Sequence, residues 1–328
     1  MKWLVTGGCG FIGAALVRRL AAGNEHGIRI FDNLSVGKVE YLALPRAPRV
    51  LREPTAMLPL PDGGTVDVVV GDIRDAAATA KAAEGMDVIV HLAANTGVQP
   101  SIKNPRMDCE ANVAGTLNIL EAARAAGVKR FVMASSGAPL GDAEPPFDEE
   151  TVARPISPYG ASKLAGEAYC HAYAKSFGLE TVPLRFSNVY GPGSDHKGSV
   201  VAAFMKRALA RQSFVVNGDG QQTRDFIYLD DLLEALVAAA TMPGVGGELF
   251  QIATGRETRV IDLAELLRSL LAEAGWNGIE IEYGAPLVGD ARRNFATVAK
   301  AQGRLGWKPT IMLPEGLRRT VDWFKQQP

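Results

Sequence analysis

The stretch KWLVTGGCGFIGAALVRRLAAG, residues 2–23, decides the fold class. Its first apolar run predicts a short buried strand, and the Ala- and Leu-rich run after the glycines predicts a helix. Gly7, Gly10 and Gly13 stand between the two. Their missing side chains permit a tight turn and let a diphosphate approach the start of the helix. Taken alone, the motif is also compatible with a purely structural turn.

Asp32 closes the next apolar run, IRIFD at residues 28–32. A carboxylate at the end of the second strand can accept hydrogen bonds from both hydroxyls of an adenosine ribose, and it repels a 2′-phosphate. The glycine turn and Asp32 together therefore favour NAD over NADP as the cofactor. The alternative is that Asp32 is a simple turn residue.

Short strands rich in Val and Ile alternate with Ala- and Leu-rich helices through the first half of the chain, as in VDVVVGD (66–72), DVIVHLAA (87–94) and VKRFVMAS (128–135). This alternation predicts an α/β fold with a Rossmann-type doubly wound parallel sheet over residues 1–183. Gly, Pro and polar clusters interrupt the pattern after residue 184, so we expect residues 184–328 to form mainly a smaller α/β lid that binds the substrate, with residues of about 225–253 returning to the first domain. Residues 41–65 are predicted to be a loop without a chemical role.

Composition excludes several classes of function. The chain has 328 residues, a formal net charge of −1 and 47% hydrophobic residues, so its charge does not favour a nucleic-acid partner. We expect no membrane partner, because no apolar run approaches the roughly 20 residues of a membrane span. The start of the chain also lacks the apolar core of a secretory signal, so we expect a cytoplasmic location. Three scattered cysteines predict neither a disulfide framework nor a metal site.

Tyr159 and Lys163 lie four residues apart in a segment predicted to be helical, SPYGASKLAGEAYCHAYA (157–174), which places both on one helical face. A lysine ammonium beside a phenol, together with a helix N-terminus, favours the phenolate and so lowers the phenol pKa from its usual value near 10. The pair can then act as a general base. Tyr-x-x-x-Lys is common by chance, but here it follows a dinucleotide-binding pattern and a strand that ends in Ser135 and Ser136.

Further motifs extend over nearly the whole chain: DNLSVG (32–37), GDIRD (71–75), HLAA (91–94), NVAGTLNIL (112–120), LRFSNVYGPG (184–193), GDGQQTRDFIYLDD (218–231) and LGWKP (305–309). With TGGCGFIG (6–13), the serines at 135–136 and YGASK (159–163), they resemble the extended short-chain dehydrogenase/reductase superfamily. Within it, the chain is most similar to nucleotide-sugar 4-epimerases, with the UDP-glucose/UDP-galactose pair first.

The resemblance implies a role for each matching residue. The catalytic hydroxyl, counted back from Gly141, falls on Ser136, and Ser135 is expected to stabilise the turn at the strand end. The implied catalytic residues are Ser136, Tyr159 and Lys163; the implied NAD-binding residues are Gly7, Gly10, Phe11, Ile12, Gly13, Asp32, Asn33, Ser35, Gly37, Asp72, Ile73, Leu92, Ala93, Ala94, Tyr159 and Lys163; the implied substrate-binding residues are Ser136, Asn188, Ser199, Val200, Arg224 and Arg292. An alternative for Arg224, whose guanidinium suits phosphate oxygens, is a surface salt bridge with Asp225.

The implied reaction is redox-neutral. Tyr159 takes the proton of the sugar O4 while hydride passes from C4 to NAD, the 4-keto sugar rotates, and hydride returns to the opposite face. The implied partners are a UDP-hexose and a second copy of the chain. The helix after NVAGT and the Tyr159 helix would form the four-helix contact of a homodimer.

The chain departs from the pattern of the family in four places, two of them residue pairs. Gly137 and Ala138 replace the Asp–Glu pair of sugar dehydratases and disfavour a 4,6-dehydratase. Pro139 and Leu140 replace a Val-Tyr pair, and we interpret this as the loss of a phenol from the pocket wall. Leu287 stands where many relatives have a diphosphate-binding Arg, for which Arg292, Arg293, His196 or Lys197 are candidate replacements. Gln99 replaces an Arg that could pair with a uronate, and so favours a neutral hexose.

Several alternatives stay open at this point. The substrate pair could be the N-acetylated one or UDP-glucuronate, and the reaction could be that of a decarboxylase or a reductase of the same superfamily. A protein that only senses NAD or a nucleotide-sugar is the alternative from another class. The presence of Ser136, Tyr159 and Lys163 together argues against a sensor, which needs no proton-transfer group.

Overall fold

The structure is a computed structural model and describes residues 1–52, 60 and 63–327. Its centre is an eight-stranded sheet with the order β12-β7-β6-β5-β1-β2-β4-β3. All neighbouring strands are parallel. The strands are β1 (Lys2–Thr6), β2 (Gly27–Asp32), β3 (Arg49–Leu51), β4 (Val66–Val70), β5 (Val88–His91), β6 (Arg130–Ser136), β7 (Glu180–Phe186) and β12 (Phe250–Ile252). The predicted Rossmann-type parallel sheet is confirmed.

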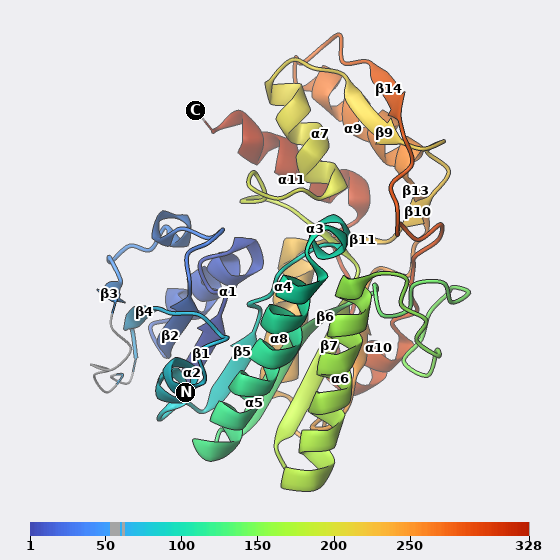
Figure 1. Cartoon of the computed structure of the whole chain (residues 1–328). Helices are drawn as coiled ribbons and strands as arrows, with labels where there is room; N and C mark the ends of the chain where they lie inside the picture. The colour runs from blue at the N-terminus through green and yellow to red at the C-terminus, as the bar shows by residue number, and fades with distance from the viewer. Residues whose placement is uncertain (53–59, 61–62, 328) are drawn as a thin grey trace.

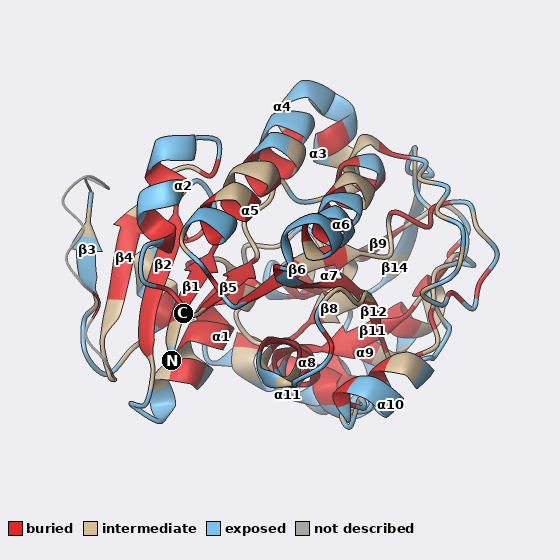
Figure 2. Ribbon diagram, turned by 90° about the horizontal axis from the view of Figure 1, so that it is seen from below, coloured by how far each residue is buried: buried red, intermediate tan, exposed pale blue. Residues whose placement is uncertain are grey.

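Helices cover both faces of the sheet, which is why its strands are apolar on both sides. One face carries α1 (Phe11–Ala22), α8 (Leu229–Thr241) and α10 (Ala299–Leu305); the other carries α2 (Ala76–Ala83), α5 (Gly115–Ala125) and α6 (Pro158–Phe177). Successive residues of β1 alternate between the two cores: Trp3 and Val5 belong to the first and Leu4 to the second. Figure 2 shows the strands buried between helices whose outer surfaces are exposed.

A second group of elements stands above the carboxyl ends of the strands (Figure 1). It contains α7 (Val200–Leu209), β9 (Phe214–Asn217), α9 (Val260–Glu273), β14 (Ile281–Gly284) and α11 (Leu313–Lys325), which enclose a third apolar core. Two small sheets connect it to the large one: β8 (Asn188–Tyr190) with β11 (Phe226–Tyr228), and β10 (Thr223–Arg224) with β13 (Thr258–Arg259). Ligands of open parallel sheets bind at this edge.

The segment predicted as a loop, 41–65, has more structure than expected. Its start belongs to a 3₁₀ helix, η1 (Val39–Leu42), and β3 extends the edge of the sheet by pairing with β4. The apolar part of β3 is only Val50 and Leu51, too short for a periodic signal. Residues 53–59 and 61–62 of the predicted loop lie outside the described residues.

The polypeptide between β5 and α5 forms three short helical pieces, α3 (Val98–Lys103), α4 (Pro105–Cys109) and the π-helical turn η3 (Glu110–Ala114). Asn112 connects them to the strand end: its Oδ1 accepts from the backbone of Asn95, and its Nδ2 donates to Asp108 and Ser162. In the described part of the chain, no helix combines the length and the apolar character that a membrane crossing needs.

Candidate active site

Two cavities adjoin at the carboxyl edge of the sheet. The first, of about 460 Å³, extends from the glycine turn and Asp32 to Tyr159. The second, of about 220 Å³, lies between the ends of β6 and β7 and the elements above. Tyr159 and Phe186 line both cavities, so the phenol stands where their contents meet. The first cavity opens between β1 and β5, where the strand order reverses.

The glycine turn packs directly against the end of β5. A Cβ on Gly7, whose φ is +67°, would stand 2.8 Å from the backbone nitrogen of Ala93, and one on Gly13 would stand 2.3 Å from the oxygen of Gly7. Only glycine fits these two positions. The helix α1 then begins at Phe11 with no side-chain cap, so its first N–H groups are available to an anion in the cavity.

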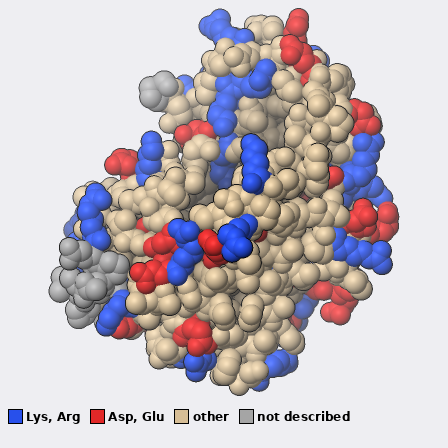
Figure 3. Space-filling model, in the orientation of Figure 1, with Lys and Arg blue, Asp and Glu red and all other residues tan. Residues whose placement is uncertain are grey.

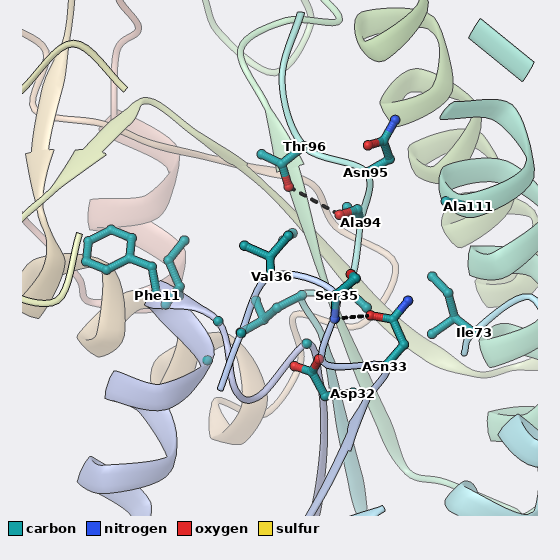
Figure 4. A pocket seen from close by; sticks show the side chains of 18 of the residues that line it. Phe11, Asp32, Asn33, Ser35, Val36, Ile73, Ala94, Asn95, Thr96 and Ala111 are labelled. Atoms are coloured by element: carbon teal, nitrogen blue, oxygen red, sulfur yellow. Dashed lines mark hydrogen bonds between the residues drawn. The ribbon is translucent and has the colours of Figure 1, made fainter. Parts of the chain in front are cut away.

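Asp32 lies at the bottom of the same cavity (Figure 4). Its Oδ2 accepts from the backbone N–H of Cys9 at 2.9 Å and its Oδ1 from that of Leu34 at 2.8 Å. Burial raises the pKa of this carboxyl, and the two backbone hydrogen bonds oppose the rise. Each carboxylate oxygen keeps a further lone pair for a ligand hydroxyl.

The wall beside Asp32 is polar. Asn33 Nδ2 donates to Asp72 at 3.1 Å, and the guanidinium of Arg74 binds both oxygens of Asp72, at 2.8 and 2.9 Å. Arg74 holds the pKa of Asp72 well below its usual range. Arg74 was missed from the sequence; its position two residues after Asp72 in GDIRD was the available signal. Every predicted NAD-binding residue lines this cavity: Gly7, Gly10, Phe11, Ile12, Gly13, Asp32, Asn33, Ser35, Gly37, Asp72, Ile73, Leu92, Ala93, Ala94, Tyr159 and Lys163.

The helix α6 and the strand β6 bring the three predicted catalytic groups together. Pro158 occupies the first turn of α6 and Ser157 caps the helix by accepting from Gly160 N–H at 3.1 Å, so the helix starts just before Tyr159. Lys163 Nζ lies 5.8 Å from the centre of the Tyr159 ring and donates to the carbonyl of Ala134 at 2.9 Å. Ser136 ends β6 and lines the second cavity together with Tyr159.

Burial dominates the ionisation of this cluster. It raises the pKa of Tyr159 to about 12, while the nearby Ser136 hydroxyl acts in the opposite direction. It also lowers the pKa of Lys163 to about 8, against the attraction of Asp108 and Glu167. The sequence predicted a lowered phenol pKa from the lysine and the helix N-terminus. That prediction was wrong in sign, because burial of the phenol is the largest cause of its shift and raises the pKa.

Ser135 has another role than the expected turn stabilisation. Its hydroxyl donates to the buried Glu167 at 2.5 Å, and Glu167 also binds the guanidinium of Arg185 at 2.8 and 2.9 Å. The bond within the turn is made by Ser136, whose Oγ accepts from the backbone of Ala138 at 3.1 Å. Side chains alternate along a strand, so Ser135 points into the α6 face and Ser136 toward the second cavity.

Arg224 and Asn188 line the second cavity together with Ser136. Arg224 forms an ion pair with Asp290 and donates to the carbonyl of Thr223 at 2.6 Å. Its expected alternative partner, Asp225, is fully buried and accepts instead from the backbone of residues 254–256. The interpretation of Arg224 as a surface pair with Asp225 was therefore wrong.

The remaining predicted substrate residues lie outside the lining of both cavities. Ser199 and Val200 begin α7, with Ser199 as its N-cap residue. Arg292 is exposed, and its guanidinium binds Asp219 at 2.8 and 3.0 Å. Arg293 binds Glu144 and Glu257 in the same exposed setting.

The interpretation of Pro139 and Leu140 as part of the pocket wall was wrong. Both are buried, neither lines a cavity, and Leu140 belongs to the first core. A turn closed by Leu140 N–H to the carbonyl of Gly137 sends the side chain inward. The sequence also missed Asn294, which lines the second cavity opposite Gly137; a Cβ on Gly137 would stand 2.9 Å from its amide oxygen.

Comparison with known proteins agrees with this geometry. Residues 3–253 match the model of the NAD dependent epimerase/dehydratase family. The chain belongs to this family. A UDP-glucose 4-epimerase of Mycolicibacterium smegmatis is 37% identical, with 100% of this chain and 99% of that protein covered. This member of the extended short-chain dehydrogenase/reductase superfamily is an NAD-dependent enzyme of the nucleotide-sugar class.

Solved structures of nucleotide-sugar 4-epimerases are similar to this chain over nearly its whole length. The UDP-glucose 4-epimerase of Thermotoga maritima, solved with UDP-glucose, has a TM-score of 0.87 and 34% identity, with 99% of each chain covered. A UDP-N-acetylglucosamine 4-epimerase of Methanobrevibacter ruminantium, in complex with UDP-N-acetylmuramic acid, also has a TM-score of 0.87, with 29% identity over 100% of this chain and 99% of that chain.

The first cavity of this epimerase/dehydratase family member fits NAD. The glycine turn leaves no side chain between the backbone and a diphosphate, and Asp32 offers acceptors for ribose hydroxyls but would repel a 2′-phosphate. NAD, when bound, supplies a hydride acceptor and donor and, in its oxidised form, a positive charge. No group of three or more His, Cys, Asp or Glu side chains among the described residues could hold a metal ion.

Proposed function

We propose that this enzyme epimerises a nucleotide-sugar at C4, with UDP-glucose and UDP-galactose as its substrate pair. One observation carries the proposal: Tyr159 lines both the NAD-sized cavity and the adjoining cavity that holds Ser136, Asn188 and Arg224. A proton-transfer group at that junction can act on a sugar hydroxyl beside the cofactor. The names of the relatives at 37% and 34% identity support the choice of UDP-glucose.

In the proposed reaction, Tyr159 accepts the proton of the sugar O4 and later returns it. The phenol is protonated at neutral pH in the protein alone, because burial raises its pKa to about 12. A positive charge next to a phenol lowers its pKa, so Tyr159 loses its proton more readily in the NAD-loaded enzyme. Ser136 lies in the same cavity as the phenol and offers a second hydroxyl to the sugar O4, and Lys163, held by the Ala134 carbonyl, presents its ammonium to the cofactor side.

The proposed position of the substrate diphosphate is at Arg224. Its side chain is only 12% exposed, and it pairs with Asp290. A diphosphate would compete with Asp290 for the guanidinium. Arg224 is the one cationic side chain among the described residues that line the second cavity, so no second cation is available for a uronate carboxylate. Gln99 donates to the carbonyl of Val288 at 2.8 Å and carries no charge, which also supports a neutral hexose.

A 4,6-dehydratase is the less favoured reaction. It needs an acid and a base for the additional proton transfers, and positions 137 and 138, which line the second cavity, are Gly and Ala. Asp290 is the carboxylate among the described lining residues, and it is already paired with Arg224. An N-acetylated sugar is the second candidate, because the relative from Methanobrevibacter ruminantium bears that name.

We further propose that the enzyme acts as a homodimer through α5 and α6. Tyr169 and Phe177 on α6 are 37% and 54% exposed. Phe177 lies under the guanidinium of Arg124 from α5, at 5.0 Å. Exposed aromatic side chains on a helix pair are suited to a protein interface.

The test is incubation of the purified protein with NAD and UDP-galactose, with the products separated by chromatography. Parallel reactions contain UDP-N-acetylgalactosamine and UDP-galacturonate. The proposal predicts UDP-glucose as the fastest product, without net formation of NADH. If none of the three substrates reacts although NAD is bound, the enzyme is not a UDP-hexose 4-epimerase. A faster reaction of the N-acetylated substrate would move the assignment to the second candidate.

A further inference from the structure

The turn at residues 194–198 contributes to the lining of the NAD cavity, and neither the resemblance nor the comparisons assign it a role with the cofactor. His196, Lys197 and Gly198 line the cavity together with Phe11 and Val36, which Figure 4 shows on its glycine-turn side. His196, Lys197 and Gly198 belong to the polypeptide between β8 and α7. The rest of the lining comes mainly from the large sheet and the segments that follow its strands.

Short hydrogen bonds fix the shape of this turn. The buried Ser194 donates its hydroxyl to the carbonyl of Gly191 at 2.7 Å and accepts from Lys197 N–H at its own carbonyl at 2.9 Å. Lys206 Nζ donates to the carbonyl of Lys197 at 2.7 Å. With its backbone held in this way, the turn presents the Lys197 side chain to the cavity.

His196 packs the turn against the 3₁₀ helix η1. Its ring stacks on Tyr41, with centroids 5.0 Å apart and an interplanar angle of 13°. The side chain is 13% exposed. Tyr41 belongs to η1, which follows the Asp32 loop, and its carbonyl accepts from Arg18 of α1 at 2.6 Å. The stack therefore joins the upper elements to the part of the large sheet that surrounds Asp32.

Lys197 is a charge without a partner among the residues that the structure describes. The described residues lining the NAD cavity include three Lys or Arg side chains: Arg74, Lys163 and Lys197. Arg74 is bound to Asp72, and Lys163 to the Ala134 carbonyl. Within residues 1–52, 60 and 63–327, no hydrogen bond or ion pair involves the Lys197 ammonium, which lies in a half-buried position where an unpaired charge is costly. Figure 3 shows Lys and Arg side chains along the hollow between the lower and upper parts of this face.

We propose that Lys197 binds the diphosphate of NAD and that the His196–Tyr41 stack closes the turn over the bound dinucleotide. The site lies next to Phe11, where α1 begins uncapped; a Cβ on Gly193 of the same polypeptide would lie 3.9 Å from the Phe11 ring. The helix N-terminus and the ammonium would then bind the diphosphate from two sides. The sequence had offered His196 and Lys197 only as replacements for an Arg that binds the substrate. Their place in the NAD cavity instead of the second one favours the cofactor.

The test measures the binding of NAD, ADP, adenosine and UDP to the NAD-free protein by calorimetry. Lys197→Met is compared with Lys197→Arg and with Lys129→Met, which removes an exposed lysine at the opposite end of β6. We expect Lys197→Met to weaken NAD and ADP about tenfold or more. Lys197→Arg should retain most of the affinity, and Lys129→Met should bind as the parent does. Adenosine, which has no phosphate, should bind the parent and Lys197→Met equally.

Two results would overturn the proposal. One is equal NAD affinity in Lys197→Met and Lys129→Met. The other is a loss of UDP affinity with NAD affinity unchanged, which would place Lys197 at the substrate. The stack has its own measurement, the rate at which NAD is released on dilution. His196→Ala should release NAD several-fold faster than the parent. His196→Phe, which keeps an aromatic face, should release NAD at nearly the parent rate. Equal release rates in the two variants would show that the His196–Tyr41 stack does not hold the turn over NAD. These binding measurements need no turnover, so they remain decisive even if the proposed epimerisation fails.

Discussion

At the scale of single residues, Tyr159 is the group on which the proposed chemistry depends. It is the titratable side chain that lines both cavities, and Ser136 and Lys163 are arranged around it. Its role as the base was predicted from YGASK together with the dinucleotide-binding pattern and the strand that ends in Ser135 and Ser136. Its ionisation was not, because the sequence shows the neighbouring lysine but not the burial that raises the phenol pKa to about 12.

Removing the phenolic hydroxyl is the direct test of this residue. Tyr159→Phe keeps the ring that packs between the cavities but has no proton to exchange, so we expect kcat for UDP-galactose to fall about 100- to 10,000-fold. NAD affinity should change little, because the glycine turn and Asp32 are untouched. Full activity in this variant would exclude Tyr159 as the base.

Lys163 has a pKa lowered by burial from its ordinary 10.5 to about 8. Between these values the unfolded chain binds a proton that the folded protein does not, so this lysine makes the free energy of unfolding rise with pH. We expect the parent to gain about 2 kcal/mol relative to Lys163→Met between pH 8 and pH 10, measured by urea unfolding at both values. If the difference in the free energy of unfolding between the parent and Lys163→Met were the same at pH 8 and pH 10, the pKa of Lys163 would not be lowered in the folded protein.

At the scale of elements, α6 is held to the sheet by a buried charge cluster that the sequence did not reveal. Glu167 of α6 binds Arg185 of β7 and Ser135 of β6, and the two charged side chains are each 6% exposed. This cluster connects the helix that carries Tyr159 to the strand that carries Ser136. It can therefore fix the spacing between the two.

Breaking this cluster should cost much more than breaking an exposed ion pair. Arg185→Met leaves Glu167 buried without its partner, and we expect a loss of about 3–5 kcal/mol in urea unfolding. Arg19→Met is the matched control, because the Arg19–Glu234 pair is 40% and 55% exposed and should contribute less than about 1 kcal/mol. Similar losses in the two variants would contradict the structural role of the buried pair.

The elements themselves show what a sequence can predict. The glycine turn, the strands and the helix of Tyr159 follow from local patterns, namely apolar runs, Gly positions and a Ser-Pro start. The edge strand β3 and the inward turn at Leu140 do not, because each depends on a distant segment that accepts its hydrogen bonds or buries its side chain. Arg224 pairs with Asp290 for the same reason: the two are separated by 66 residues in the chain.

At the scale of the whole molecule, the proposed homodimer has a simple test. We expect sedimentation analysis to give twice the 34.9 kDa mass of the chain. Tyr169→Glu, which places a charge on the exposed face of α6, should shift the protein toward the monomer. Tyr283→Glu is the control, since Tyr283 is 61% exposed on β14, away from α6. A monomeric parent protein would contradict the assignment of α5 and α6 as an interface.

The proposed reaction requires that NAD take a hydride from C4 of the sugar and return it to the same carbon, while Tyr159 takes and returns the proton of O4. The most direct measurement uses UDP-galactose deuterated at C4 with the NAD-loaded enzyme, followed by mass spectrometry and NMR of the UDP-glucose formed. If hydride leaves C4 and returns to it, the deuterium is retained and is found at C4 of UDP-glucose. Loss of the label to solvent, or its appearance at another carbon, would exclude this mechanism.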